Sequence, residues 1–204
     1  ARIVLPYLRR RGVSRLEALI LTHPDLDHIG GGKVVTETLD PRFIMDPAQA
    51  TGKDAYVDIL EVATDKGIPW IETKRGFVLE LDGVRFEVLY PDGPAITPAG
   101  KSDSNAQSVV VLVRYGAFEA LLTGDAPTEV EERLLADLPG DLELLKVGHH
   151  GSNTSTSPEL LDRTSPELAV VSVGARNRYG HPHAAVLERL VDAGLRVLRT
   201  DERG

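Results

Sequence analysis

Four potential metal ligands are crowded into one short loop of this 204-residue sequence. The stretch "ILTHPDLDHIGGG" contains His23, Asp25, Asp27 and His28, with no lysine or arginine among them. Imidazole nitrogens and carboxylate oxygens bind divalent cations, and a bound cation supplies the positive charge that two neighbouring carboxylates otherwise lack. The loop is therefore a candidate metal site.

The remaining histidines fall in two later segments. One aspartate, like them, follows a predicted strand. "KVGHHGSNTST" contains His149 and His150, "NRYGHPHAA" contains His181 and His183, and "LLTGDAP" contains Asp125. A lone histidine is usually structural, so neither His181 nor His183 by itself indicates a site. An adjacent pair at the end of an apolar strand is different, because a buried and unpaired imidazole pair is costly. The His149–His150 pair and Asp125 are therefore further candidate ligands.

Composition limits the classes of protein to consider. A chain of 204 residues with 42% hydrophobic residues can bury the core of one domain. The net charge of -8 repels polyanions unless local basic groups or bound cations receive them. The absence of cysteine excludes disulfides, thiolate nucleophiles and cysteine-type zinc sites. The apolar runs are far shorter than the roughly 20 residues of a membrane span, which predicts a soluble fragment.

Apolar periodicity and turn signals predict alternating helices and strands without a linker. Hairpins turning at 82–83 and 115–116 predict antiparallel strands in the middle of the chain. Thr128 and Glu131 predict a capping box, and Ser157-Pro158 predicts a helix start. Helices are expected at 4–12, 33–39, 54–67, 128–138 and 184–194, and further strands at 16–22, 42–46, 142–148, 168–174 and 195–200. Each candidate loop then follows a strand.

Six stretches together resemble the metallo-β-lactamase superfamily, whose first-loop motif is His-x-His-x-Asp-His followed by Gly. They are "LTHPDLDHIGG", "SDSNAQSVVVLV", "LLTGD", "LLKVGHHGS", "VVSVGARNRYGHPH" and "RTDERG". More narrowly, they resemble the C-terminal metallo-β-lactamase-like domain of the ComEC/Rec2 DNA-internalisation proteins of competent bacteria. The resemblance implies an α/β fold, a four-layer αββα sandwich with two metals at one sheet edge. It further implies that residues 1–204 are a single domain without the usual first strands and last strand.

The resemblance implies two divalent cations and seven ligands. The ligands are His23 and Asp25 for one metal, Asp27 and His28 for the other, Asp125 as the bridge, and His149 or also His150 closing the second site. This chain departs from the common motif, because Asp25 replaces its second histidine and no histidine occurs between His28 and His149. Asp103 or Asn105 could fill the vacancy. An oxygen-rich site favours Mn²⁺, with Mg²⁺ and Zn²⁺ as alternatives.

The implied activity is metal-assisted hydrolysis of phosphodiesters, and in this family a nuclease acting on the DNA strand that is not imported. Asp27 and Asp125 would be catalytic through the cations, and His181 or His183 would protonate the leaving oxygen or bind phosphate. Asn105, Ser152, Asn153 and His183 are candidate substrate contacts. Ser152 is not predicted to be a nucleophile, since no Gly-x-Ser-x-Gly elbow presents it.

Two other functions remain open from the sequence. One is a small-molecule metallohydrolase, such as a phosphorylcholine-esterase-like, thioester or lactam hydrolase; the other is a metal-stabilised DNA-uptake domain without turnover. The expected partners are DNA, in single-stranded form, and the transmembrane channel portion of the same parent protein. The expected location is a soluble domain of a bacterial inner-membrane protein, with the extracytoplasmic side favoured.

Overall fold

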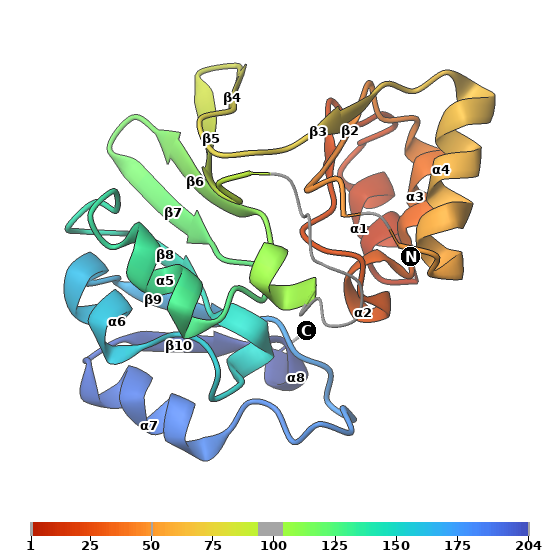
Figure 1. Cartoon of the computed structure of the whole chain (residues 1–204). Helices are drawn as coiled ribbons and strands as arrows, with labels where there is room; N and C mark the ends of the chain where they lie inside the picture. Colours follow the sequence, from red (N-terminus) through yellow and green to blue (C-terminus); the bar gives the residue numbers. More distant parts are fainter. Residues whose placement is uncertain (1, 50, 94–103, 204) are drawn as a thin grey trace.

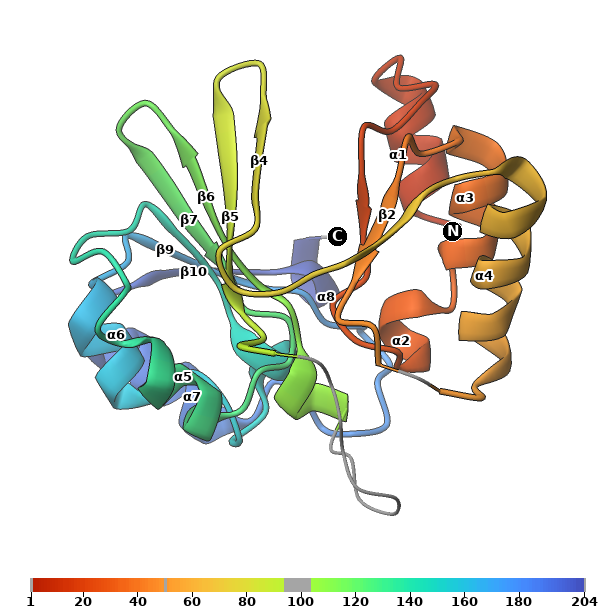
Figure 2. The ribbon, with the colours of Figure 1, turned by 45° about the horizontal axis from the view of Figure 1, so that its top comes forward.

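Four layers, in the order helix, sheet, sheet and helix, make up the computed structural model, which describes residues 2–49, 51–93 and 104–203 (Figures 1 and 2). One sheet has three parallel strands, β1 (Leu19–Ile20), β2 (Ile44–Asp46) and β3 (Trp70–Glu72). The other has seven strands in the order β10-β9-β8-β7-β6-β5-β4. The predicted αββα sandwich is confirmed.

Three helices cover the outer face of the three-stranded sheet: α1 (Val4–Arg10), α3 (Gly32–Leu39) and α4 (Asp54–Lys66). The apolar residues of α4 recur at helical spacing, so that Tyr56, Ile59 and Ala63 lie on one face and are buried. They pack against Leu21 and Ile44 on the strand side. This packing holds β1, and therefore the loop that follows it, against a rigid layer.

The seven-stranded sheet changes from antiparallel to parallel at its middle strand. Its strands are β4 (Val78–Leu81), β5 (Val84–Tyr90), β6 (Val110–Tyr115), β7 (Phe118–Leu122), β8 (Leu144–Lys146), β9 (Leu168–Val171) and β10 (Arg196–Arg199). β4 to β7 pair antiparallel through the two predicted hairpins, which are confirmed. β7 to β10 pair parallel, because helical crossovers return the chain to the same sheet edge.

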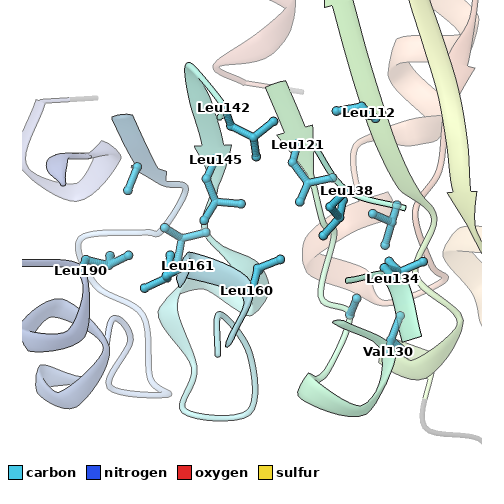
Figure 3. Packing of buried hydrophobic residues seen from close by; sticks show 14 of the residues in the cluster. Leu112, Leu121, Val130, Leu134, Leu138, Leu142, Leu145, Leu160, Leu161 and Leu190 are labelled. Atoms are coloured by element: carbon cyan, nitrogen blue, oxygen red, sulfur yellow. The ribbon is translucent and has the colours of Figure 1, made fainter. Parts of the chain in front are cut away.

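The largest core lies between this sheet and its covering helices, α5 (Thr128–Leu134), α6 (Pro158–Thr164) and α7 (Ala184–Asp192). Figure 3 shows leucines from strands and helices interdigitating there, among them Leu121, Leu145 and Leu160. As predicted, α6 begins after Ser157, whose hydroxyl accepts a hydrogen bond from the Leu160 amide at 3.1 Å. A further core, with Met45 and Val111 among its members, separates the two sheets.

Several local predictions were wrong or incomplete. β3 was not predicted, and β1 is shorter than expected. The first ligand loop contains a helical turn, α2 (Leu26–Ile29), and 3₁₀ turns occur at Ser104–Gln107 and Gly148–Gly151. A final helix, α8 (Thr200–Arg203), follows β10. Within the described ranges, no helix is both long and apolar enough to cross a membrane.

The predicted capping box at the start of α5 is also wrong. The N-cap position is Pro127, and the Thr128 hydroxyl donates to the Thr154 carbonyl at 3.2 Å. The Glu131 side chain turns away from the start of α5 and accepts hydrogen bonds from the amides of Thr156 (2.6 Å) and Ser157 (2.8 Å). Those buried amides need an acceptor more than the partly exposed helix start does. Glu131 therefore holds the segment that follows the His149–His150 pair.

Glu131→Ala is expected to destabilise the fold by about 2 to 4 kcal/mol, because it leaves two buried amide donors without a partner. The measurement is urea unfolding, with the slope of the transition unchanged and its midpoint lowered. Glu132→Ala is the matched control, since Glu132 is the exposed neighbour on the same helix. Equal losses in the two variants would show that the Glu131 hydrogen bonds do not stabilise the loop.

Candidate metal centre

The strand topology brings the candidate loops to one edge of the sandwich. β7, β8 and β9 are parallel, so their carboxyl ends, and the loops after them, lie at the same edge of the sheet. The first ligand loop comes from the other sheet and is tied to this edge by a hydrogen bond from the Val109 amide to the Thr22 carbonyl, 2.9 Å long. Candidate ligand loops that are distant in sequence therefore lie together at this edge.

Asp125 is the centre of the cluster and is buried. Its Oδ2 atom lies 3.1 Å from Nε2 of His28, 3.6 Å from that of His150, 3.7 Å from that of His149 and 3.9 Å from that of His23. The preceding Gly124 has a φ of 55°, and a Cβ there would lie 3.0 Å from the Ser108 Cβ. Only glycine fits this close approach without strain. The Asp125 amide donates to the Ser108 hydroxyl at 3.1 Å, which fixes the turn.

Two groups of side chains could each hold a metal ion, with ligand atoms within 4.8 Å of one another. The first is His23, His28 and Asp125, and the second is Asp27, His28 and His150. In the second group, Nε2 of His150 lies 3.0 Å from Nε2 of His28 and 3.6 Å from Oδ2 of Asp27. The two groups share His28 and are therefore adjacent.

A hydrogen bond from one ring nitrogen of His150 leaves its other nitrogen available as a metal ligand. Nδ1 of His150 donates to the Ser172 carbonyl at 2.6 Å, so Nε2 of the neutral ring carries a lone pair. The buried Nε2 of His23 and Oδ1 of Asp125 have no hydrogen-bond partner among the described residues. Buried polar atoms without partners are costly, and a bound cation would satisfy both. The donor set fits a divalent metal.

The protonation states also suit metal binding. Burial, reinforced by repulsion from His28, lowers the pKa of His23 to about 4, so its imidazole is neutral at pH 7. Burial alone would raise the pKa of Asp125, but the hydrogen bond with His28 and the charge of Lys146 hold it below its usual range. A neutral imidazole and an ionised carboxylate are the forms that bind metals.

Asp25 lies at the edge of the cluster and is already engaged by protein groups. Its Oδ2 atom is 3.7 Å from Nε2 of His23. Lys53 forms an ion pair with it, and the Ser104 hydroxyl donates to both carboxylate oxygens at 2.8 and 2.9 Å. Burial opposes ionisation, but the hydrogen bonds from Lys53 and Ser104 hold the pKa of Asp25 below its usual value. Asp25 is therefore an oxygen donor beside the first group.

The paired histidines His149 and His150, in the loop after β8, have unusual backbone conformations. His149 (φ 46°, ψ 45°) and His150 (φ 55°, ψ 20°) are both left-handed, which costs on the order of 1–3 kcal/mol per non-glycine residue. The following Gly151 has a φ of 85°, and a Cβ there would lie 2.5 Å from the Pro182 Cβ. The close packing against Pro182 supports a turn that directs both imidazoles toward Asp125. Strain of this kind is typical of functional sites.

An open cleft of about 620 Å³ adjoins the cluster. His149 lies on its wall, with Nδ1 3.0 Å from the Thr154 hydroxyl and its ring centroid 5.7 Å from that of His181. The lining residues are Asp25, Leu26, Asp27, Asp125, His149, His150, Arg176, Asn177, Arg178, Tyr179 and His181. The cleft gives a substrate access to both ligand groups.

The other predicted site residues lie at varying distances from this cleft. His183 is the N-cap residue of α7, and its ring centroid is 5.0 Å from that of His181. Ser152 is buried, with its hydroxyl 3.0 Å from that of Thr154. Asn105 and Asn153 line a second cavity of about 410 Å³, which shares His149 with the cleft. Asp103 lies outside the described residues.

Sequence reasoning missed several residues that contact the candidate ligands. Ser108 and Ser104 belong to the singled-out "SDSNAQS" stretch, and Lys146 to "LLKVGHHGS", so their motifs contained a signal. The Ser108 hydroxyl lies 3.2 Å from Nδ1 of His23, and Nζ of Lys146 lies 3.7 Å from Oδ1 of Asp125. Lys53 precedes a helix in an ordinary polar segment, and no pattern pointed to it.

The family model described as "Metallo-beta-lactamase superfamily" matches residues 1–175. The chain belongs to this superfamily. The metallo-β-lactamase superfamily typically binds divalent metals, in agreement with the two ligand groups found here. A solved member, the metallo-beta-lactamase fold protein YhfI from Bacillus subtilis, has a TM-score of 0.56 and 12% identity, covering 98% of this chain and 81% of YhfI. That likeness shows the shared fold.

Two relatives within the superfamily are far more similar in sequence. ComE operon protein 3 of Bacillus subtilis (strain 168) is 37% identical over 204 residues, which are 100% of this chain and 26% of that protein. Competence protein ComA of Neisseria gonorrhoeae is 36% identical over 203 residues, 98% of this chain and 26% of ComA. The predicted kinship with ComEC/Rec2 competence proteins is confirmed. The chain spans about a quarter of the length of these relatives.

Proposed function

We propose that this domain is a two-metal phosphodiesterase that hydrolyses DNA and, in natural transformation, degrades the strand that is not imported. The observation that carries the proposal is the pair of adjacent ligand groups, His23/His28/Asp125 and Asp27/His28/His150, beside an open cleft. Kinship with competence proteins supports DNA as the substrate.

The proposed ligands follow the geometry of the cluster. His23, Asp25 and Asp125 would hold one cation, and Asp27, His28 and His150 the other, with the Asp125 carboxylate between them. Bound there, two such cations would supply positive charge to a phosphodiester and would acidify a water molecule. They would also allow a polyanion to bind despite the net charge of -8, because they would place positive charge where the phosphate binds.

We assign the leaving-group role to His181, which lines the cleft beside His149. Burial lowers the pKa of His181, and the neighbouring His183 and His149 lower it further. A lower pKa makes the protonated ring a stronger acid toward a leaving oxygen, although less of it is protonated at pH 7. In this proposal His181 is the proton donor, and the rings of His149 and His183 lie near it, with centroids 5.7 Å and 5.0 Å away.

The main alternative is a small-molecule metallohydrolase, since a cleft of about 620 Å³ also has the size of a small-ligand pocket. The test uses metal-stripped domain reloaded with one metal at a time, and four substrates: labelled single-stranded DNA, labelled duplex DNA, a small phosphodiester and a β-lactam. We expect cleavage of single-stranded DNA and no turnover of the lactam. Turnover of small substrates alone would favour the alternative, and no turnover at all would favour a non-catalytic domain.

The paired histidines provide a test of the ligand assignment. We expect His150→Ala to lower the DNA-cleavage rate by more than about 100-fold, because loss of a ligand exceeds the 10–100-fold cost of losing a residue behind one. His149→Ala should cost less than this but more than His183→Ala, since His149 lies on the cleft wall and His183 at a helix start. Initial rates and bound metal are measured for each variant. Greater loss in His183→Ala than in His149→Ala would place the functional histidine in the "GHPH" loop.

The longer relatives suggest the setting in which this activity would operate. We propose that the domain belongs to a bacterial inner-membrane protein and lies on the extracytoplasmic side, beside the transmembrane channel of the same protein. In that position it would degrade the strand that is not imported while the other strand enters the channel. Protease accessibility in intact spheroplasts tests the membrane side.

A further inference from the structure

The loop between β9 and α7 forms one wall of the cleft and is not used as a ligand source. Arg176, Arg178 and Tyr179 line the cleft from this loop, together with Asp25 and Asp27 of the first ligand loop. Figure 2 shows the loop, in light blue, extending to the side of α2. A substrate bound to the ligand groups would therefore lie against it.

The loop presents an aromatic surface next to positive charge. Tyr179 is 60% exposed, and its ring stacks on that of His181 with centroids 5.9 Å apart and planes inclined by 19°. The Arg178 guanidinium carbon lies 5.4 Å from the centroid of the Tyr179 ring. Among the described residues, neither Arg176 nor Arg178 forms an ion pair, and the Arg178 guanidinium only donates to the Tyr179 hydroxyl at 3.4 Å, so both charges can receive a phosphate. In a chain of net charge -8, an exposed aromatic ring beside these two guanidinium groups favours a ligand that is both anionic and planar.

This surface is held in shape before any ligand binds. The Asn177 side chain accepts hydrogen bonds from the amides of Tyr179 (3.2 Å) and His181 (2.9 Å). It also donates to the carbonyls of Gly174 (3.0 Å) and His181 (2.7 Å). Because the loop is already ordered, binding loses less conformational entropy there.

We propose that Arg176, Arg178 and Tyr179 form a binding platform for single-stranded DNA. An unpaired base stacks on Tyr179, the two guanidinium groups contact the neighbouring phosphates, and the next phosphodiester is thereby placed over the ligand groups. Stacking on an exposed aromatic ring requires a base that is free of its partner strand, which selects single strands over duplex. The inference rests on the proposed function in taking DNA as the substrate, but the platform itself needs no catalysis.

The test measures binding rather than cleavage. Fluorescence anisotropy of the domain as purified, with a labelled phosphorothioate oligothymidylate that resists hydrolysis, gives the Kd. We expect Tyr179→Ala to raise the Kd about 10-fold and Tyr179→Phe to leave it unchanged, in line with the roughly 1–3 kcal/mol of one base–aromatic stack. Tyr115→Ala is the matched control, because Tyr115 is also 60% exposed but ends β6 at the hairpin turn remote from the cluster.

Two further ligands separate stacking from charge and single strand from duplex. An abasic oligomer of equal charge should bind the parent about 10-fold more weakly, and Tyr179→Ala should weaken it no further. Arg176→Ala and Arg178→Ala should each reduce the salt dependence of binding by close to one counterion. A duplex should bind at least 10-fold more weakly than the single strand.

The outcomes distinguish failure of the platform from failure of the proposed function. Unchanged affinity in Tyr179→Ala, or equal affinity for abasic and normal oligomers, overturns the platform even if the parent cleaves DNA. Equal affinity for duplex and single strand overturns the strand preference. If no DNA is cleaved under any metal but the Tyr179 effects hold, the platform stands and the nuclease proposal fails.

Discussion

Replacing Asp125 with alanine is expected to lower the rate of DNA hydrolysis by at least about a thousandfold. Both cations depend on this carboxylate, and with them several kcal/mol of transition-state stabilisation. The carboxylate lies within 3.9 Å of four imidazoles, from the first ligand loop and the loop after β8. Without it the metal content should fall from two equivalents to at most one. Elemental analysis of dialysed protein and initial rates on labelled DNA measure both effects.

Two further variants distinguish loss of the metal site from loss of folding. Asp125→Asn keeps the shape of the side chain and removes its charge, and it should lose activity while retaining a cooperative unfolding transition. Asp141→Ala alters an exposed carboxylate ahead of β8, at the opposite end from the histidine pair, and should leave rate and metal content unchanged. An Asp125→Ala protein that retains two tightly bound metals would show that the bridging assignment is wrong.

The second large effect concerns which metal supports activity. Beside the first ligand group lies an aspartate, Asp25, where the common motif has a histidine, and the group itself includes the Asp125 carboxylate. Carboxylate and water ligands suit Mn²⁺ or Mg²⁺ better than the nitrogen-rich tetrahedral sites that Zn²⁺ prefers. We therefore expect DNA hydrolysis to be fastest with Mn²⁺ and at least about 10-fold slower with Zn²⁺, because ligand type sets this preference.

Exchanging the ligand type tests this reason directly. Asp25→His should shift the preference toward Zn²⁺, whereas Asp58→His, at a half-exposed position of α4 that pairs with Lys33, should not. Initial rates are measured across a titration of each metal on stripped parent and variants. Strong activity of the parent with Zn²⁺, and no shift in Asp25→His, would refute the argument from ligand hardness and leave the metal site itself standing.

The sequence by itself determined the features that depend on neighbouring residues. The four potential ligands from His23 to His28 fall within six residues, and the hairpins, the Ser157 cap and the long amphipathic helix α4 follow from turn residues and periodicity. These signals act over about ten residues, so they survive whatever the rest of the chain does. The motif pattern also identified the superfamily and therefore the four layers.

Tertiary structure decided which loops meet and which partner each polar group finds. Glu131 leaves its expected capping role for two buried amides 25 residues away or more, and Lys53 pairs with Asp25 across 28 residues. The 3.0 Å contact between His28 and His150 depends on the parallel register of β7, β8 and β9 and on the two sheets packing together. Such distances are set by long-range packing and by the need to satisfy buried polar groups, and neither is encoded in any short window of residues.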